Sequence, residues 1–350
     1  MRALNSLVLP PLSALYNAIS GARTRLFQGG ILRVQQLDGP VISVGNLTTG
    51  GTGKTPLVEW VVLELASQGR KPCILTRGYG RANPKTQVVV SDFKEVFASP
   101  EQAGDEAYLL AKKLRGLAMV ISNSDRIAAG REAASRFAAN TFVLDDGFQN
   151  LRVARDLDIV TIDATNPWGG GHLLPWGRMR EPLSGLRRAD CVVLTRVDLV
   201  EDTREIVLRL NSLAGTRPLF RSRMIANGFF SVRKTEVRSE PSLETPLAAF
   251  CGVGNPRAFF DELRNLGYEL SLTKSFPDHH WYRQQDLNLL VQEAAKLGVR
   301  SLVTTAKDAV KLTSLRIAMP CYVLDIKMEI DEATQFSDLI RKACVRSGLA

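Results

Sequence analysis

The sequence predicts an α/β protein that combines a mostly parallel β-sheet with a second, smaller α/β domain. From residue 41 onward, short apolar runs alternate with amphipathic stretches, which is typical of parallel strands joined by crossover helices. A second series of this kind starts near residue 247. The chain has 350 residues, of which 45% are hydrophobic, and this is enough for two packed cores.

The apolar runs define the expected elements in chain order. In the first series, strands are expected at residues 41–44, 73–76, 118–122, 142–145, 159–163 and 191–195. In the second series, strands are expected at 247–253, 301–305 and 322–324, with a helix at 256–266. Residues 220–237 and 322–330 have the composition of extended segments, and 336–347 that of a final helix. Functional side chains are expected where the parallel strands end.

These elements divide the chain into predicted parts. Residues 34–219 form the first domain and 241–319 the second, and 220–240 and 320–330 are paired linker strands between them. The final helix, within 331–350, is expected to return to the first domain. The expected fold is therefore two α/β domains joined by a two-stranded linker.

Residues 1–33 have the composition of a membrane-associating segment. Residues 3–22 carry no charge, and Arg23, Arg25 and Arg33 follow them. A spanning helix needs about 20 predominantly apolar residues, whereas Pro10 and Pro11 interrupt this run among polar side chains. An interfacial anchor is therefore favoured, with apolar side chains in the lipid and arginines on anionic headgroups. A cleaved signal peptide and a helix packed on the protein's own core are the alternatives.

The overall charge favours anionic partners. Forty-five Lys and Arg exceed 36 Asp and Glu, and the formal net charge of +9 suits nucleic acid, acidic lipid or a phosphorylated substrate. The five cysteines are scattered and form no C-x-x-C pair. This pattern argues against a disulfide framework and a zinc site, and it indicates a reducing compartment.

The strongest local signal is VISVGNLTTGGTGKTP at residues 41–56, where a strand leads through a glycine loop into a helix. It is a variant of the Walker A phosphate loop in which Thr48 replaces the first glycine. In such a P-loop, backbone N–H groups point at phosphate oxygens, Lys54 reaches the β- and γ-phosphates, and Thr55 ligates Mg²⁺. The expected nucleotide-binding residues are Thr48, Thr49, Gly50, Gly51, Thr52, Gly53, Lys54 and Thr55.

Two adjacent acids, Asp145 and Asp146, end the strand expected at 142–145. Close carboxylates raise each other's pKa unless a cation or a base neutralises them. A P-loop also needs an acidic partner for Mg²⁺ at the end of a neighbouring strand, so a metal site is favoured here. The alternative is a helix cap beside a surface acid.

Eight motifs in sequence order carry a family resemblance. They are the segment 45–56, TRGYGR at 76–81, GDE at 104–106, SDR at 124–126, DDGFQ at 145–149, LP at 174–175, REP at 180–182 and FPDH at 276–279. In order and spacing they resemble the tetraacyldisaccharide 4'-kinase family over nearly the whole chain. The resemblance implies an enzyme that transfers the γ-phosphate of ATP, with Mg²⁺, to the 4'-hydroxyl of a tetraacylated glucosamine disaccharide 1-phosphate.

The resemblance also implies roles for individual residues. Asp105 would take the hydroxyl proton, His279 would orient Asp105 or share that proton, and Lys54 would act on the phosphates. Glu181 would join Thr55, Asp145 and Asp146 around Mg²⁺. The implied substrate contacts are Asn46, Arg77, Tyr79, Arg126 and Arg180. Two segments depart from the family pattern, namely PWGR at 175–178 and TAKD at 305–308, where Ala306 stands in place of an acid.

The resemblance further implies a monomer at the cytoplasmic face of the inner membrane, peripheral or anchored by its N-terminus, that does not bind nucleic acid. Three alternatives remain. One is a P-loop GTPase of the metallochaperone or membrane-partitioning type, since TRVD at 195–198 is a distant match to a guanine-reading N-K-x-D. The others are a soluble small-molecule kinase and a non-catalytic, nucleotide-gated binding module.

Overall fold

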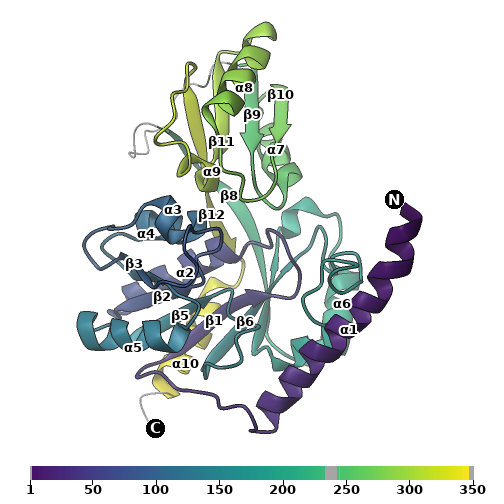
Figure 1. Cartoon of the computed structure of the whole chain (residues 1–350), viewed down its shortest axis with the longest axis vertical. Coiled ribbons are helices and arrows are strands. Elements are labelled where there is room, and N and C mark those ends of the chain that lie inside the picture. The colour runs from purple at the N-terminus through teal and green to yellow at the C-terminus, as the bar shows by residue number, and fades with distance from the viewer. Residues whose placement is uncertain (1, 233–242, 244, 347–350) are drawn as a thin grey trace.

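The fold is built on one continuous sheet of twelve strands, seen in a computed structural model that describes residues 2–232, 243 and 245–346 (Figure 1). The strand order is β10-β9-β11-β12-β8-β7-β6-β1-β5-β2-β4-β3. The strands are β1 Val41–Asn46, β2 Pro72–Thr76, β3 Val88–Ser91, β4 Met119–Ser122, β5 Thr141–Asp145, β6 Leu157–Asp163, β7 Cys191–Thr195, β8 Leu219–Ser231, β9 Leu247–Cys251, β10 Leu270–Ser275, β11 Ser301–Thr305 and β12 Cys321–Ile330. The predicted α/β class with a mostly parallel sheet is confirmed.

Helices cover both faces of this sheet. They are α1 Arg2–Gln28, α2 Lys54–Ser67, α3 Pro100–Ala103, α4 Asp105–Lys113, α5 Arg126–Phe137, α6 Arg204–Ala214, α7 Pro256–Asn265, α8 Gln284–Lys296, α9 Ala306–Ala309 and α10 Ala333–Arg346, with 3-10 turns η1 Leu183–Arg188 and η2 Val197–Leu199. Residues of α2, α4 and α10 share one buried cluster with β1, whereas α5 belongs to a different cluster. The central strands are buried along their whole length, which is why they read as continuous apolar runs.

The long strands β8 and β12 pair antiparallel in the interior of the sheet and connect its two parts (Figure 1). On one side of this pair lie β1–β7, called here the large part, and on the other side lie β9–β11 with α7, α8 and α9, called the small part. Much of the small part packs in buried clusters separate from those around β1. The division into two domains at the predicted boundaries stays a prediction. Residues 233–237 of the expected extended segment, and residue 347 of the expected final helix, lie outside the described residues.

Two edge strands, β3 and β10, were not predicted. The β3 strand has four residues and pairs antiparallel with β4, and β10 alternates between half-buried and exposed positions beside β9. Neither strand forms the continuous buried run by which the central strands were recognised. They do not change the predicted class.

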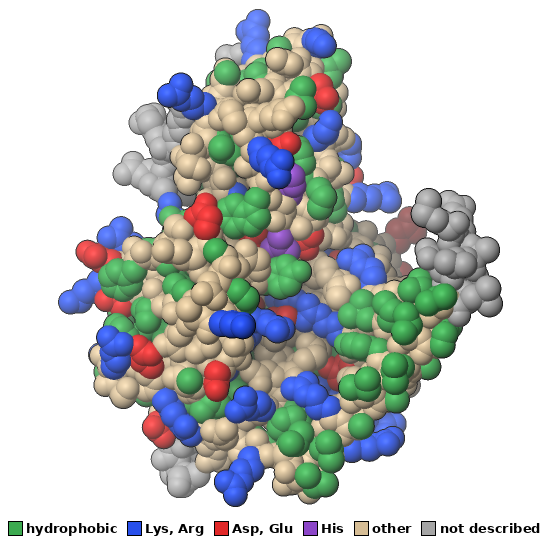
Figure 2. All heavy atoms as spheres, viewed as in Figure 1, with side chains coloured by type: hydrophobic (Ala, Val, Ile, Leu, Met, Phe, Trp, Pro, Cys, Tyr) green, Lys and Arg blue, Asp and Glu red, His purple; other side chains and the backbone are tan. Residues whose placement is uncertain are grey.

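The N-terminal helix α1 lies along the side of the large part (Figure 1). The Ser13 Oγ donates to the Leu173 carbonyl at 3.0 Å, and the Tyr16 hydroxyl donates to the Arg180 carbonyl at 2.7 Å. Another face of α1 exposes large apolar side chains, namely Val8, Leu12, Leu15, Ile19 and Leu26. Figure 2 shows apolar side chains gathered along this helix. Within the described part of the chain, no helix combines the length and the apolar character needed to cross a bilayer.

Candidate active site

A cleft of about 920 Å³ opens where the parallel strands of the large part end, facing the small part. Figure 2 shows the corresponding hollow, with basic side chains and a histidine around it. Its lining comes from the P-loop, the ends of β2 and β5, the start of α4, the start of α7 and the loop after β10. Carboxyl ends of parallel strands are the usual place for a ligand in open α/β sheets.

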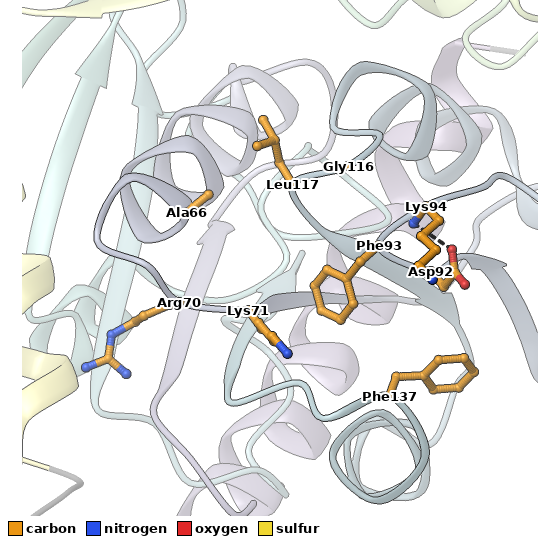
Figure 3. Close-up of a pocket in the computed structure, with 9 residues that line it drawn as sticks. All are labelled: Ala66, Arg70, Lys71, Asp92, Phe93, Lys94, Gly116, Leu117 and Phe137. Atoms are coloured by element: carbon orange, nitrogen blue, oxygen red, sulfur yellow. Dashed lines mark hydrogen bonds between the residues drawn. The ribbon is translucent and has the colours of Figure 1, made fainter.

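A second cavity of about 460 Å³ lies at the opposite edge of the sheet, where β2 and β4 begin (Figure 3). Its lining residues are Ala66, Arg70, Lys71, Asp92, Phe93, Lys94, Gly116, Leu117 and Phe137. The carboxylate in this lining, Asp92, accepts from the backbone N–H groups of Lys94 and Glu95 at 2.7 Å each. Asp92 closes its own turn, and none of the predicted site residues lines this cavity.

The P-loop follows β1, and the side chain of Asn46 stabilises it through hydrogen bonds. The Asn46 Nδ2 donates to the Thr48 carbonyl at 2.6 Å and lies 2.9 Å from Thr52 Oγ1. Gly53 adopts a left-handed φ of 82° and turns the chain into α2. A loop of this shape leaves backbone N–H groups free to face an anion.

Most of the predicted nucleotide-binding residues line the cleft: Thr49, Gly50, Gly51, Thr52, Gly53, Lys54 and Thr55. Two predicted site residues lie outside the cleft lining, and their predicted contacts stay predictions. Asn46, predicted as a substrate contact, is fully buried and supports the loop. Thr48, predicted as a nucleotide contact, is also buried and lies outside the cleft lining.

The two acids after β5 have different surroundings. Parallel pairing sets Asp145 beside Val44 of β1, directly before the P-loop. The Asp146 carboxylate lies 3.1 Å from Lys54 Nζ and accepts two bonds from Arg180 Nη1 at 2.6 and 2.8 Å. Burial acts to raise the pKa of Asp146, but the charges of Lys54 and Arg180 prevail and lower it to about 2. Asp146 is therefore an ionised carboxylate that forms ion pairs with Lys54 and Arg180.

Asp145 is buried and only partly paired. Its Oδ2 accepts from Thr76 Oγ1 at 2.8 Å, whereas Oδ1 has no hydrogen-bond partner among the described residues. Burial, with the nearby charges of Glu106 and Asp146, raises the pKa of Asp145 to about 6. A buried carboxylate oxygen without a partner, at the edge of a phosphate loop, fits a hard divalent cation that prefers oxygen ligands.

Glu181 differs from its predicted place in the metal site. Its Oε1 accepts from Gln149 Nε2 at 2.7 Å, and its Oε2 lies 2.8 Å from Arg188 Nη1. The side chain is buried and lies outside the cleft lining. Across the described ranges, no three His, Cys, Asp or Glu side chains gather as a ready metal cluster. A cation in the cleft would thus depend on Thr55, Asp145 and Asp146, and on oxygen atoms of the phosphates.

His279 lines the cleft and contacts Asp105, which is buried directly behind the lining. Asp105 is the first residue of α4 in the large part, and His279 follows β10 in the small part. The Nδ1 atom of His279 lies 3.0 Å from both carboxylate oxygens of Asp105. The two side chains were expected to meet only on closure of the cleft, but they are already in contact in this structure.

Asp105 is almost completely buried and surrounded by cations. Lys311 Nζ lies 3.6 Å from its Oδ2, and Lys307 also acts on it electrostatically. Burial would raise the pKa of Asp105, but the His279 hydrogen bond and these two charges hold it below the usual range. The carboxylate is therefore ionised at neutral pH and able to accept a proton.

The other predicted substrate residues all line the cleft: Arg77, Tyr79, Arg126 and Arg180. Arg126 begins α5, whose N-terminus is capped by the Asp125 carboxylate through the N–H groups of Ile127 and Ala128. Burial, the largest influence, lowers the pKa of Arg126 to about 10 despite the nearby acids. The Tyr79 ring packs against His279 with centroids 4.7 Å apart.

Several cleft residues were not predicted. Arg196 Nη1 donates to the Gly51 carbonyl at 2.8 Å and pairs with Asp163, so it holds the P-loop from the end of β7. Gly254 approaches the same loop so closely that an added Cβ would lie 2.5 Å from Gly51 N. Gly254 belongs to none of the predicted motifs, and Arg196 was noted only within TRVD at 195–198. Lys307 belongs to the TAKD segment noted in the sequence, but its contacts could not be predicted because its partners Glu106, Asp278 and His279 lie in other elements.

A loop built to hold phosphates lines one cleft together with His279, which contacts the buried carboxylate of Asp105. The fold and the cleft therefore define a P-loop phosphotransferase. Comparison with known proteins narrows the class: the chain belongs to the tetraacyldisaccharide-1-P 4'-kinase family, whose sequence profile matches residues 5–345. The family predicted from the eight motifs is confirmed.

Individual relatives agree with this assignment. The tetraacyldisaccharide 4'-kinase of Desulfotalea psychrophila is 37% identical over 342 residues, which cover 97% of this chain and 96% of that protein. The protein of the same name from Desulfatibacillum aliphaticivorans is 34% identical and covers 97% of this chain and 92% of that protein. The crystal structure of an LpxK from Aquifex aeolicus in complex with ATP has 31% identity and a TM-score of 0.75, covering 97% of this chain and 99% of that one. The GTPase alternative is not favoured.

Proposed function

We propose that this protein transfers the γ-phosphate of ATP to the 4'-hydroxyl of a tetraacylated glucosamine disaccharide 1-phosphate. The observation that carries the proposal is that His279, which contacts the buried Asp105, lines the same cleft as the P-loop. Membership of the kinase family supports it, as does the ATP complex of the Aquifex aeolicus relative. The reaction needs a hydroxyl, a phosphoryl donor and a proton acceptor in one cleft.

In this proposal each group has one task. The P-loop N–H groups and Lys54 bind the β- and γ-phosphates, and Thr55, Asp145 and Asp146 hold Mg²⁺. When bound, Mg²⁺ neutralises charge on the phosphates. Asp105 accepts the proton of the attacking hydroxyl.

Three cationic residues complete the site in this proposal. Arg77, Arg126 and Arg180 bind phosphate groups of the donor and the acceptor, since guanidinium groups match phosphate geometry. Tyr79 packs on His279 beside the same cleft. These side chains supply positioning and charge, which are the main requirements of phosphoryl transfer.

We also propose that α1 anchors the protein to an anionic membrane surface, at the cytoplasmic face of the inner membrane. The exposed side chains Leu12, Leu15 and Ile19 supply an apolar face, with Arg23 and Arg25 after it. A helix with one apolar face and adjacent basic residues lies in the interface and buries that face in lipid. The proposed partner is a lipid substrate rather than nucleic acid, and the proposed state is a monomer of two domains.

The experiment is phosphoryl transfer from γ-labelled ATP with Mg²⁺ to a panel of acceptors. The panel contains the tetraacylated disaccharide 1-phosphate, the same disaccharide without acyl chains, and free glucosamine. We expect label in the acylated acceptor and none with Asp105→Asn, which keeps the shape of the side chain. Label in the free sugars would favour a soluble small-molecule kinase. Nucleotide binding without transfer to any acceptor would favour the binding module.

A further inference from the structure

Lys307 is the second residue of the short helix α9 and reaches three groups at the rim of the cleft. Its Nζ lies 2.7 Å from Glu106, 3.1 Å from Asp278 and 3.2 Å from His279 Nε2. Burial opposes its charge, but the nearby acids Glu106, Asp105 and Asp278 prevail and raise the pKa of Lys307. Lys307 is therefore an ammonium group with three N–H donors and no acceptor.

This contact determines where the proton of His279 lies. Since Lys307 can only donate, His279 Nε2 must accept, and a nitrogen that accepts carries no proton. The single proton of the neutral ring is then on Nδ1, which lies 3.0 Å from both oxygens of Asp105. The Nδ1–H group donates to the carboxylate, so both ring nitrogens are engaged.

The ring is held in this orientation from several sides. The backbone of His279 has φ 60°, a left-handed conformation that is uncommon for histidine. The backbone N–H of His279 donates to the Gly252 carbonyl at 3.2 Å, and the Tyr79 ring packs against the imidazole. These contacts accompany an orientation in which Nδ1 lies toward Asp105 and Nε2 toward Lys307.

We propose that Lys307 is a positioning residue that fixes His279 in the Nδ1–H tautomer, so that His279 orients Asp105 and takes no proton from the acceptor. The inference rests on the proposed function and deepens it. As the acceptor oxygen bonds to the γ-phosphorus, its proton passes to Asp105, and the bond between the γ-phosphorus and the leaving ADP oxygen breaks. His279 keeps its own proton throughout.

The other cation near Asp105 does not share this role. Lys311 Nζ is fully buried and lies 3.0 Å from Asp308 and 3.6 Å from Asp105. It lies beside the Asp105 carboxylate and, in the described part of the chain, forms no hydrogen bond with the His279 ring. Lys307 is thus the cation that distinguishes the two nitrogens of His279.

The test is nitrogen-15 NMR of histidine-labelled full-length protein. The chain has three histidines, so comparison with His279→Gln assigns the His279 signals. In the wild type we expect a protonated Nδ1 and an unprotonated Nε2 near neutral pH. In Lys307→Met the donor to Nε2 is lost and Asp278 Oδ1 remains 3.9 Å from that nitrogen, so the His279 signals should differ from those of the wild type at the same pH. Lys307→Arg keeps a donor and should preserve the wild-type signals.

Lys274→Met is the matched control, since Lys274 pairs with Glu293 on the surface of the same part of the protein. It should leave the His279 signals unchanged. A protonated Nε2 in the wild type, or unchanged His279 signals in folded Lys307→Met, would overturn the inference. Because these signals need no turnover, the result is independent of whether the proposed kinase reaction is correct.

Kinetics provide the second measurement. A positioned acid–base group contributes about 10²–10⁴ in rate, so loss of its orientation should lower kcat about tenfold or more in Lys307→Met. The KM for ATP should stay unchanged, and Lys307→Arg should recover most of kcat. An unchanged kcat in Lys307→Met with the altered NMR signals would overturn the positioning role.

Discussion

The ammonium group of Lys54 lies 3.1 Å from the carboxylate of Asp146. Lys54 belongs to the P-loop and Asp146 follows β5, so this ion pair joins the two strand ends that form the floor of the cleft. Asp146 holds Lys54 toward the space where phosphates are expected, and Arg180 holds Asp146 from the other side. The lysine is therefore oriented before any phosphate arrives.

Replacement of this lysine tests the phosphate site. Lys54→Ala should lower kcat about 10²–10³-fold, because it removes a charge that stabilises the phosphates during transfer. Lys296→Ala, an exposed lysine at the end of α8, is the control and should have no effect. Circular dichroism checks that both variants fold. Near-normal turnover of a folded Lys54→Ala protein contradicts the site.

The Asp105–His279 contact predicts strongly non-additive losses. Asp105→Ala and His279→Ala should each lower kcat with little change in ATP affinity, since neither side chain has a place in the proposed nucleotide contacts. The double variant should be little worse than the worse single variant, because the residues act as one unit. Single-turnover rates of the four proteins measure this, and multiplied losses would show two independent contributions.

The ionisation of Asp105 predicts a pH dependence of stability. Its folded-state pKa lies below the unfolded value of about 3.9, so ionised Asp105 stabilises the fold above that pH. This contribution is lost as the pH falls through about 4 and below. Asp105→Asn should therefore reduce the free energy of unfolding by ~3 kcal/mol at pH 7, because buried cations lose their partner. Denaturant unfolding at pH 7 and at pH 3 should show the difference shrinking.

The exposed face of α1 predicts a variant that separates membrane contact from folding. Leu15→Asp with Ile19→Asp places charges on the apolar face and leaves the Tyr16 contact with the large part intact. Activity on substrate in vesicles should fall strongly, and activity on detergent-dispersed substrate should persist. Vesicle co-sedimentation measures binding directly. Equal losses in both formats would favour a structural helix.

The close approach of Gly254 predicts an effect on nucleotide affinity. Gly254→Ala places a methyl group 2.5 Å from the Gly51 nitrogen, so the P-loop or the start of α7 must shift. The KM for ATP should rise several-fold, while thermal stability changes little. Gly21→Ala is the matched control, because a Cβ there meets nothing within 4 Å. Equal ATP affinity of the two alanine variants would show that the contact between Gly254 and the P-loop does not affect nucleotide binding.

The sequence predicted the elements whose signal is local. A strand that runs into a glycine loop is visible in consecutive letters, and Asp145 was found because it ends an apolar run. Whether a polar side chain binds a ligand or forms hydrogen bonds within the fold does not follow from consecutive residues. Asn46 supports the P-loop and Glu181 pairs with Arg188, although both have the polarity of ligand-binding residues. Their partners depend on packing between elements, which no single window of sequence contains.

The order of the chain has a consequence for synthesis on the ribosome. Phe336 of α10 is fully buried and its ring lies 5.1 Å from that of Trp60 and 4.8 Å from that of Phe220. The hydrophobic core around β1 therefore stays incomplete until α10 has left the exit tunnel. The small part packs on β8 and β12, which both precede α10, so it can fold before the large part is complete. A ribosome stalled so that β12 has left the tunnel and α10 has not should hold a protected small part and a large part still sensitive to protease.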